Sequence, residues 1–123
     1  MVRQKGSPTS ADAIADVTYK IIKTILNKAN FKDFGTYHVA LDGETNWYQY
    51  ASFATNEAID FGLKTTMTSQ DIRSIPSNVC PKRAKRPINS RLDTTKIKKA
   101  FMLELPSWEG EVVAALKLAL INA

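Results

Sequence analysis

Apolar side chains recur at helical spacing near the start of the chain, in the stretch "GSPTSADAIADVTYKIIKTILNK". Pro8 stops any earlier structure, Thr9 can cap a helix, and Asp12 follows three residues later, as in a capping box. The pattern predicts an amphipathic helix that begins just after Pro8. Its apolar stripe consists of Ile14, Val17, Ile21 and Ile25.

Residues 35–41, "GTYHVAL", alternate between two faces. Neither face carries a side chain that is always charged, so the segment suits a strand that is buried inside a sheet. Such a strand needs neighbours for its backbone hydrogen-bonding groups. Because the chain offers only one other candidate strand, we expect the partners of this strand to lie outside the chain. Tyr37, Val39 and Leu41 form one face, and Thr36, His38 and Ala40 form the other.

A second helix is predicted after Thr45, which can cap it, and Gly62 supplies a left-handed stop. The stretch "LKTTMTSQDI", residues 63–72, is polar and β-prone, which is typical of a short exposed strand. The next twenty residues are rich in Pro, Ser, Asn and Arg and predict an irregular loop. The apolar positions of the helix are Trp47, Ala51, Ala54, Ala58 and Phe61.

The pattern predicts two helices at the end of the chain. "DTTKIKKAF", residues 93–101, has the spacing of a short helix with Ile97 and Phe101 facing inward. "LPSWEGEVVAALKLALIN" begins a further helix with Ser107 as its cap and two glutamates in the first turn, where the helix dipole favours negative charge. The order helix, strand, helix, strand, loop, helix, helix predicts a mostly helical α/β fold.

Composition favours one soluble domain. A chain of 123 residues can bury a real core, and 44% hydrophobic with 24% charged residues is ordinary for a globular protein. The longest apolar run, 112–121, is interrupted by Lys117 and is too short to span a bilayer. Cys80 is the only cysteine, and no secretion signal opens the sequence. We therefore expect a single domain over residues 1–123, no membrane contact and a cytoplasmic location.

The positive charge is concentrated in the second half of the chain. Residues 1–62 hold six Lys/Arg against seven Asp/Glu, whereas residues 63–123 hold eleven against five. The difference is −1 for the first half and +6 for the second. The excess lies between Lys82 and Lys99, so an anionic partner is expected to bind there.

The stretch "KRAKRPINSRLDT", residues 82–94, has several interpretations. Its arginines can fork onto phosphate oxygens while Asn89 and Ser90 orient the ligand, which predicts a site for a small anion. It can also be a solvated basic loop, or a nucleic-acid patch or nuclear address. Base stacking would need aromatic side chains, and this stretch has none. Composition alone favours the solvated loop and leaves the anion site and the nucleic-acid interpretation open.

Three segments occur together in the order "GSPTSADAIADVT", "GTYHVALDGETNWYQYA" and "KRPINSRLDTTKIKKAFMLELPSWEGEV". They resemble the C-terminal portion of the dTDP-4-dehydrorhamnose reductase family of extended short-chain dehydrogenases/reductases. The most specific part is "RPINSRLDTTK" followed by "LPSW". The resemblance runs from about Val2 to Leu120. It implies the C-terminal substrate-binding part of such an enzyme, without its Rossmann cofactor domain.

The resemblance also implies a function and a site. The family reduces dTDP-4-dehydro-L-rhamnose to dTDP-L-rhamnose in polysaccharide biosynthesis, with NADPH or NADH bound by an N-terminal domain. The expected substrate-binding residues are Arg86, Asn89, Ser90 and Arg91, with the two arginines holding the diphosphate. The glycine-rich cofactor turn and the Tyr-x-x-x-Lys pair of the family do not occur in this chain, which we therefore expect to be inactive alone, with no catalytic residue.

A metal site is a further implication. Members of the family hold magnesium at a dimer contact through an acidic residue at the helix start, and Asp12 occupies the matching place. Independently, a missing sheet neighbour would leave apolar surface and open strand edges exposed, which favours a homodimer or aggregation. Asp12 and Asp16 lie four residues apart, so they share one helix face. The ordinary alternative for two such carboxylates is a solvated face.

The remaining polar and aromatic side chains are assigned no chemistry. His38 is expected to be a hydrogen-bonded core residue, and Cys80 a free thiol without metal-binding neighbours. Trp47, Tyr50 and Trp108 are expected in the core or at a domain contact. Tyr48 is expected to face the cleft.

Two other classes of function stay open. The first is a non-catalytic module, because relatives of this family serve as regulatory subunits that bind another enzyme. The second is a nucleic-acid binder using residues 82–99, whose affinity would fall steeply with salt. We expect the sugar nucleotide, not nucleic acid, to be the anionic partner.

Overall fold

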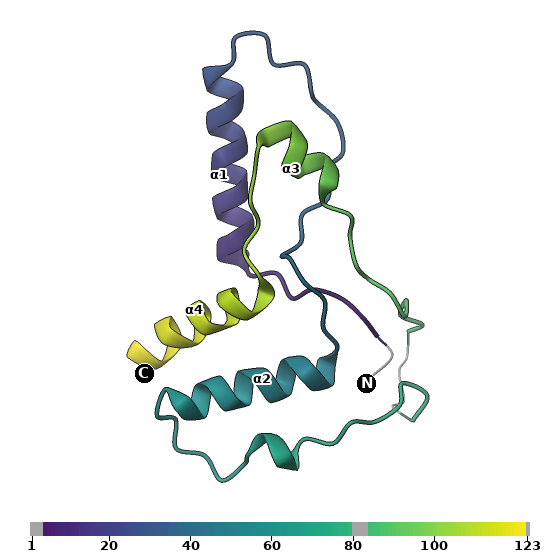
Figure 1. Ribbon diagram of the computed structural model, residues 1–123, viewed down its shortest axis with the longest axis vertical. Coiled ribbons are helices and arrows are strands. Elements are labelled where there is room, and N and C mark those ends of the chain that lie inside the picture. The colour runs from purple at the N-terminus through teal and green to yellow at the C-terminus, as the bar shows by residue number, and fades with distance from the viewer. Residues whose placement is uncertain (1–3, 80–83, 123) are drawn as a thin grey trace.

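The computed structural model describes residues 4–79 and 84–122. All four predicted α-helices are confirmed, and a short 3-10 helix lies between the second and the third (Figure 1). The fold is mostly helical, as predicted. The elements are α1 (Ala11–Asn27), α2 (Trp47–Asp60), η1 (Ser69–Asp71), α3 (Thr95–Phe101) and α4 (Trp108–Ile121).

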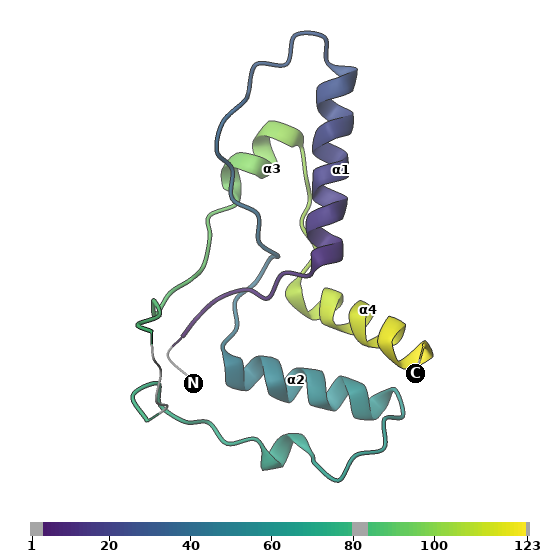
Figure 2. The same cartoon turned by 180° about the vertical axis from the view of Figure 1, so that it is seen from behind.

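The helices form two packed groups. Helix α3 lies beside α1 at one end of the molecule, and α4 lies beside α2 at the other, as both faces of the ribbon show (Figures 1 and 2). Ile97 and Phe101 are buried between the first pair, as their spacing predicts. Around them lie Val17, Leu103 and Leu105, with Ile21, Ile25, Phe31, Tyr37, Val39 and Ala100 packed outside.

A second cluster joins the two groups. Trp108, at the start of α4, is only 5% exposed and packs with Ala13 of α1 and with Leu41. The rings of Phe53 and Trp108 meet edge to face with centroids 5.2 Å apart. Trp108 is therefore the side chain through which the first turn of α1 and helix α2 are held together.

Each long helix begins at a polar cap. Ser107 accepts a hydrogen bond from the Gly110 amide at 3.2 Å, which confirms the predicted cap of α4. The other two predictions are wrong by one residue, because Ser10 caps α1 and Asn46 caps α2 in place of Thr9 and Thr45. Thr9 instead accepts a hydrogen bond from the Leu41 amide, and Thr45 is buried between neighbouring segments, which removes both from the capping position.

The predicted strand at 35–41 is extended chain without a sheet. Its alternation is right, since Tyr37 and Val39 pack on the first cluster and Leu41 on the second. Between described residues, however, only an isolated bridge from Asp42 to Ser107 forms at its end. A strand requires a ladder of paired neighbours, and the part of the chain that the structure describes supplies none, so a strand paired with neighbours outside the chain stays a prediction.

The predicted exposed strand at 63–72 is wrong. The chain there forms η1, whose entry is held by Asp71. The carboxylate of Asp71 accepts hydrogen bonds from the Thr68 amide at 2.7 Å and from the Thr68 hydroxyl at 3.0 Å. These bonds lower the pKa of Asp71, because they favour its charged form. Local side-chain bonding has therefore overcome the β propensity of the threonines.

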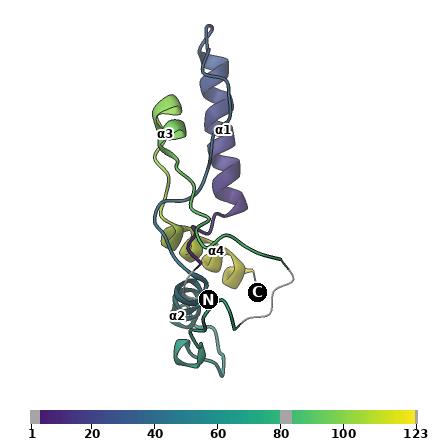
Figure 3. The same ribbon diagram turned by 90° about the vertical axis from the view of Figure 1, so that its right-hand side faces the viewer.

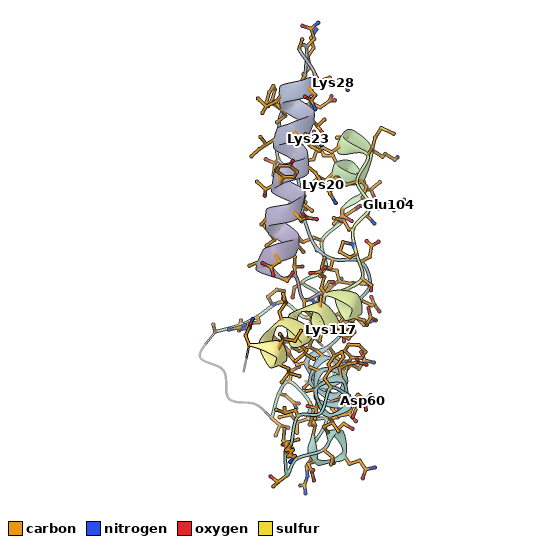
Figure 4. The ribbon with its side chains drawn as sticks, turned by 90° about the vertical axis from the view of Figure 1, so that its left-hand side faces the viewer. Lys20, Lys23, Lys28, Asp60, Glu104 and Lys117 are labelled. Carbon is orange, nitrogen blue, oxygen red and sulfur yellow. The ribbon has the colours of Figure 1, made fainter. Side chains whose placement is uncertain are left out.

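The molecule exposes a large surface for its mass. The chain has 9141 Å² of accessible surface, whereas a compact monomer of 13.7 kDa exposes roughly 6,600 Å². Seen edge-on, the molecule is narrow (Figure 3). Helix α1 carries several large apolar side chains in water, among them Tyr19, Ile22 and Leu26. Lysines project from the same helix, including Lys20 and Lys23 (Figure 4).

None of the helices in the described ranges combines the length and the apolar content that crossing a bilayer requires.

Candidate functional site

Three segments that are far apart in sequence enclose a cavity of about 610 Å³. They are the N-terminal segment 4–9, the start of α2 at 45–50, and the basic loop at 86–90. The volume lies in the range of pockets that bind small molecules. The lining residues are Gln4, Lys5, Gly6, Ser7, Pro8, Thr9, Thr45, Asn46, Trp47, Tyr50, Arg86, Pro87 and Ser90.

Backbone hydrogen bonds hold the three segments together. The Lys5 amide donates to the Ile88 carbonyl at 2.7 Å, and the Ser90 amide donates to the Lys5 carbonyl at 2.8 Å. On the other side, Gly6 and Thr45 exchange two such bonds of 3.0 and 2.8 Å. The N-terminal segment therefore lies between the basic loop and the entry to α2, as the ribbon also shows (Figure 2).

The start of α2 forms one wall of the cavity. The Asn46 side chain accepts a hydrogen bond from the Gln49 amide at 2.9 Å and so fixes the first turn. Trp47, the next residue, is 53% exposed and lines the cavity. Of the two expected places for Trp47, the core is therefore excluded, and a domain contact stays a prediction. Tyr50 lies one turn later and is half-buried.

Arg86 forms the charged part of the opposite wall. It precedes Pro87, which restricts Arg86 to extended backbone and directs the chain toward the pairing at Ile88. Its side chain is exposed and makes no ion pair with any residue that the structure describes. Arg86 is therefore available to an anionic ligand in the cavity.

Arg91 is held elsewhere, although the resemblance groups it with Arg86. Its guanidinium donates to the Glu44 carboxylate, and Lys5 approaches the same carboxylate at 3.2 Å. The Lys5 hydrogen bond, followed by the charge of Arg91, lowers the pKa of Glu44. Arg91 lines a second cavity of about 320 Å³ next to Asp42. The structure thus separates the two arginines.

Asn89 and Ser90 have different positions as well. The Asn89 side-chain carbonyl accepts from the Arg91 amide at 3.1 Å and from the Arg91 Nε at 2.9 Å. This turn orients Arg91 toward Glu44, and Asn89 does not line the cavity. Ser90 does line it, beside Gly6. Of the four predicted substrate-binding residues, the cavity contains Arg86 and Ser90.

Asp12 lines a third cavity of about 280 Å³ between α1 and α4. Asp16, Glu104 and Glu111 lie around the same cavity, and Glu111 accepts a hydrogen bond from the Ser10 hydroxyl at 2.8 Å. No group of three or more His, Cys, Asp or Glu side chains within the described ranges is close enough to hold a metal ion. Magnesium at Asp12 stays a prediction.

Three minor predictions concern other side chains. His38 is exposed, so its predicted place in the core is wrong. Its neighbours Tyr37 and Val39, on the opposite face of the extended segment, pack on the cluster around Ile97 instead. Tyr48 is half-buried and does not line the cavity, where Trp47 and Tyr50 lie instead. Cys80 lies outside the described residues, as does the start of the basic stretch, Lys82.

The N-terminal segment and Trp47 belong to the site, although the sequence patterns did not predict this. The sequence does contain features that mark both parts. "GSPT" precedes α1, and Trp47 directly follows the cap of α2. The helical spacing placed Trp47 on the apolar stripe of α2. Such spacing assigns a residue to one face of a helix, but it does not show how far along the helix that face is buried. The pairing of residues 4–6 with two distant segments leaves no local pattern.

Comparisons with known proteins identify the family to which the chain is similar. A family model described as RmlD substrate binding domain matches residues 1–121. The dTDP-4-dehydrorhamnose reductase of Salmonella typhimurium is 39% identical over 106 residues, and that of Escherichia coli K12 is 38% identical over 106 residues. Each match covers 86% of this chain and 34% of the relative. The chain therefore spans about a third of the length of the curated relatives it matches.

A solved structure has the same fold. The crystal structure of dTDP-4-dehydrorhamnose reductase from Bacillus anthracis, in complex with NADP, matches with a TM-score of 0.72. The match covers 96% of this chain and 36% of that chain, at 24% sequence identity.

Proposed function

The chain belongs to the RmlD substrate binding domain family, and from this premise we propose that it is the substrate-binding part of a dTDP-4-dehydrorhamnose reductase. The parent enzyme reduces dTDP-4-dehydro-L-rhamnose to dTDP-L-rhamnose with NADPH or NADH. Residues 1–123 act as one domain of that enzyme, located in the cytoplasm. The observation that carries this proposal is the position of Arg86, an unpaired cation among the described residues, on a cavity of about 610 Å³.

Within this proposal, Arg86 binds the diphosphate of the sugar nucleotide. A guanidinium presents parallel N–H donors that match two phosphate oxygens, and charge-assisted bonds of this kind are among the stronger ones in proteins. The Ser90 hydroxyl, on the same wall, orients the ligand. Arg91 has a positioning role, because its contact with Glu44 ties the basic loop to the segment that leads into α2.

The residues of this chain do not fit a nicotinamide cofactor. Binding of a dinucleotide pyrophosphate uses a glycine-rich turn between a strand and a helix. The five glycines of the sequence are isolated from one another, and none lies in such a turn. We therefore assign the cofactor, hydride transfer and proton transfer to a preceding domain of the parent enzyme. The chain alone is expected to be inactive.

Two features of the surface favour contact with that domain. No hydrogen bond between described residues uses the backbone amides or carbonyls of residues 37–40, although Ala40 is buried. An extended segment with unused backbone groups fits the edge of a parallel sheet supplied by another domain. The surplus of exposed surface, roughly 2,500 Å² above that of a compact chain, is also on the scale of a large interface.

The test is calorimetric titration of dTDP and of dTDP-rhamnose into the purified chain at low and moderate salt. The variant is Arg86→Ala, and the matched control is Arg73→Ala, an exposed arginine that does not line the cavity. Circular dichroism verifies that each variant is folded. We expect binding that Arg86→Ala weakens by about tenfold or more, in line with the loss of a charge-assisted hydrogen bond, whereas Arg73→Ala leaves it unchanged.

Equal affinities for the two variants would contradict the role of Arg86. A folded chain that ignores both ligands but co-purifies with a protein partner in a fixed ratio would favour the regulatory module instead. A folded chain whose affinity for any duplex falls steeply with salt would favour nucleic-acid binding.

A further inference from the structure

The geometry points to Trp47 as the platform on which the nucleobase of the ligand stacks. This inference rests on the proposed function, because it concerns the same cavity, and it assigns the aromatic end of the ligand to a residue outside the basic loop. The site would take a nucleoside diphosphate, with its base on Trp47 and its phosphates toward Arg86.

The exposure of Trp47 needs an explanation. Tryptophan is among the costliest side chains to leave in water, and Trp108 of the same chain is 5% exposed whereas Trp47 is 53% exposed. The exposed part of Trp47 faces the cavity, since Trp47 is one of its lining residues. A flat aromatic ligand would remove this surface from water.

The ring of Trp47 is supported from behind by other aromatic side chains. The rings of Trp47 and Tyr50 meet edge to face, with centroids 6.1 Å apart and planes at 85°. The rings of Tyr50 and Trp108 also lie next to each other, with centroids 6.1 Å apart, and Trp108 is buried. Because the Asn46 cap also fixes the backbone of this turn, the platform is held in place before any ligand binds.

The two walls of the cavity have different chemistry. Trp47 and Tyr50 provide aromatic surface on the α2 side, and Arg86 provides a positive charge on the side of the basic loop. A ligand with an aromatic group at one end and negative charge at the other matches both walls at once, and nucleotides are ligands of this kind. Stacking on an aromatic side chain accepts any base, so this platform supplies affinity and orientation.

Fluorescence and calorimetry together test the inference, because the sequence contains only two tryptophans. The probes are dTDP, thymidine and inorganic pyrophosphate, titrated into the purified chain and into Trp47→Phe and Trp47→Ala. In Trp47→Phe the remaining tryptophan is Trp108, which does not line the cavity. The matched control is Tyr19→Ala, which removes an exposed aromatic side chain of α1 that also does not line the cavity.

We expect dTDP to quench the fluorescence of the unmodified chain and to leave that of Trp47→Phe unchanged. Trp47→Ala should weaken dTDP by about tenfold or more, the scale of one base stacked on an aromatic ring, with no change for pyrophosphate. Trp47→Phe should retain most of the affinity, since phenylalanine also stacks. Tyr19→Ala should bind all probes like the unmodified chain.

Three results would overturn the inference. If Trp47→Ala binds dTDP as well as the unmodified chain while Arg86→Ala does not, the proposed function stands and the stacking platform falls. If Trp47→Ala weakens dTDP and pyrophosphate equally, the residue supports the fold of the cavity and does not contact the base. If none of the probes binds the folded chain, the inference and the proposed nucleotide site fall together.

Discussion

Replacing Gly43 by alanine should disturb the turn that leads into the candidate site. Gly43 has a φ of +93°, in the left-handed region where side chains are costly. A Cβ atom at this position would lie 3.0 Å from Cδ1 of Trp108 and 3.3 Å from its Nε1. Ordinary contacts between carbon atoms are about 3.5–4.0 Å, so one of the two groups must move.

Gly62 provides a matched control within the same chain. Its φ of +94° is nearly the same, and a Cβ atom there would meet nothing within 4 Å. Gly62→Ala should therefore show the backbone strain alone, about 1–2 kcal/mol of lost stability. The gain from a less flexible unfolded chain is similar for both variants and cancels in their comparison.

The difference between the two variants measures the contact with Trp108. Trp108 cannot move away freely, because its amide donates to the Asp42 carbonyl at 3.1 Å and its ring packs on Phe53. Overpacking of this kind costs about 1–3 kcal/mol. Gly43→Ala should thus lower the free energy of unfolding by about 2–5 kcal/mol in total, the sum of the strain and the overpacking.

Urea denaturation followed by circular dichroism measures both free energies of unfolding. Equal slopes of the unfolding free energy against urea would show that the two variants unfold from equally compact states. If Gly43→Ala and Gly62→Ala are destabilised equally, within about 0.5 kcal/mol, then the turn relaxes without cost and the reasoning is refuted.

Three more predictions follow from other contacts. Ile97→Ala should lower the free energy of unfolding by about 2–5 kcal/mol in the same urea assay, because Ile97 is 1% exposed. Ile22→Ala, on the outer side of α1, should lower it by less than about 1 kcal/mol, and equal losses would contradict the packing. The pKa of Glu44 is lowered from 4.5, so the stabilisation from its contacts should be present above pH 4.5 and lost as the pH falls through the lowered pKa. An NMR titration of Glu44 should show a midpoint below 4.5 that rises in Lys5→Ala. An unchanged midpoint in that variant would contradict the role of Lys5. If Asp12 binds magnesium at a dimer contact, magnesium should increase the dimer fraction of the unmodified chain in analytical ultracentrifugation and should not increase that of Asp12→Asn. An equal response of both proteins would exclude Asp12 as the ligand.

Local sequence patterns predicted the helices well. The spacing of Ile97 and Phe101, and the cap at Ser107, depend on residues that are close in the chain, so they can be interpreted without knowing the fold. The alternation at 35–41 grouped Tyr37, Val39 and Leu41 on one face, and these three side chains pack on the two core clusters. The same pattern could not show whether a neighbouring strand exists, and the described residues supply none.

In the basic loop, residues that are close in sequence have different positions in the structure. Its composition and its resemblance to a known family placed Arg86 and Arg91 together, since they are five residues apart in the sequence. In the structure, Arg91 pairs with Glu44, a residue 47 positions away, and Arg86 lines the cavity. No local pattern contains the position of Glu44, so only the fold could separate the two roles.

The sequence by itself determined where the helices lie, where positive charge gathers and which family the chain resembles, because these depend on neighbouring residues and short motifs. The tertiary structure decided which side chains share the cavity. Trp47, Arg86 and Ser90 meet there because backbone pairing brings residues 4–6 between two distant segments. Such pairing depends on the packing of the whole chain, since each backbone group can bond to any segment that the fold brings beside it.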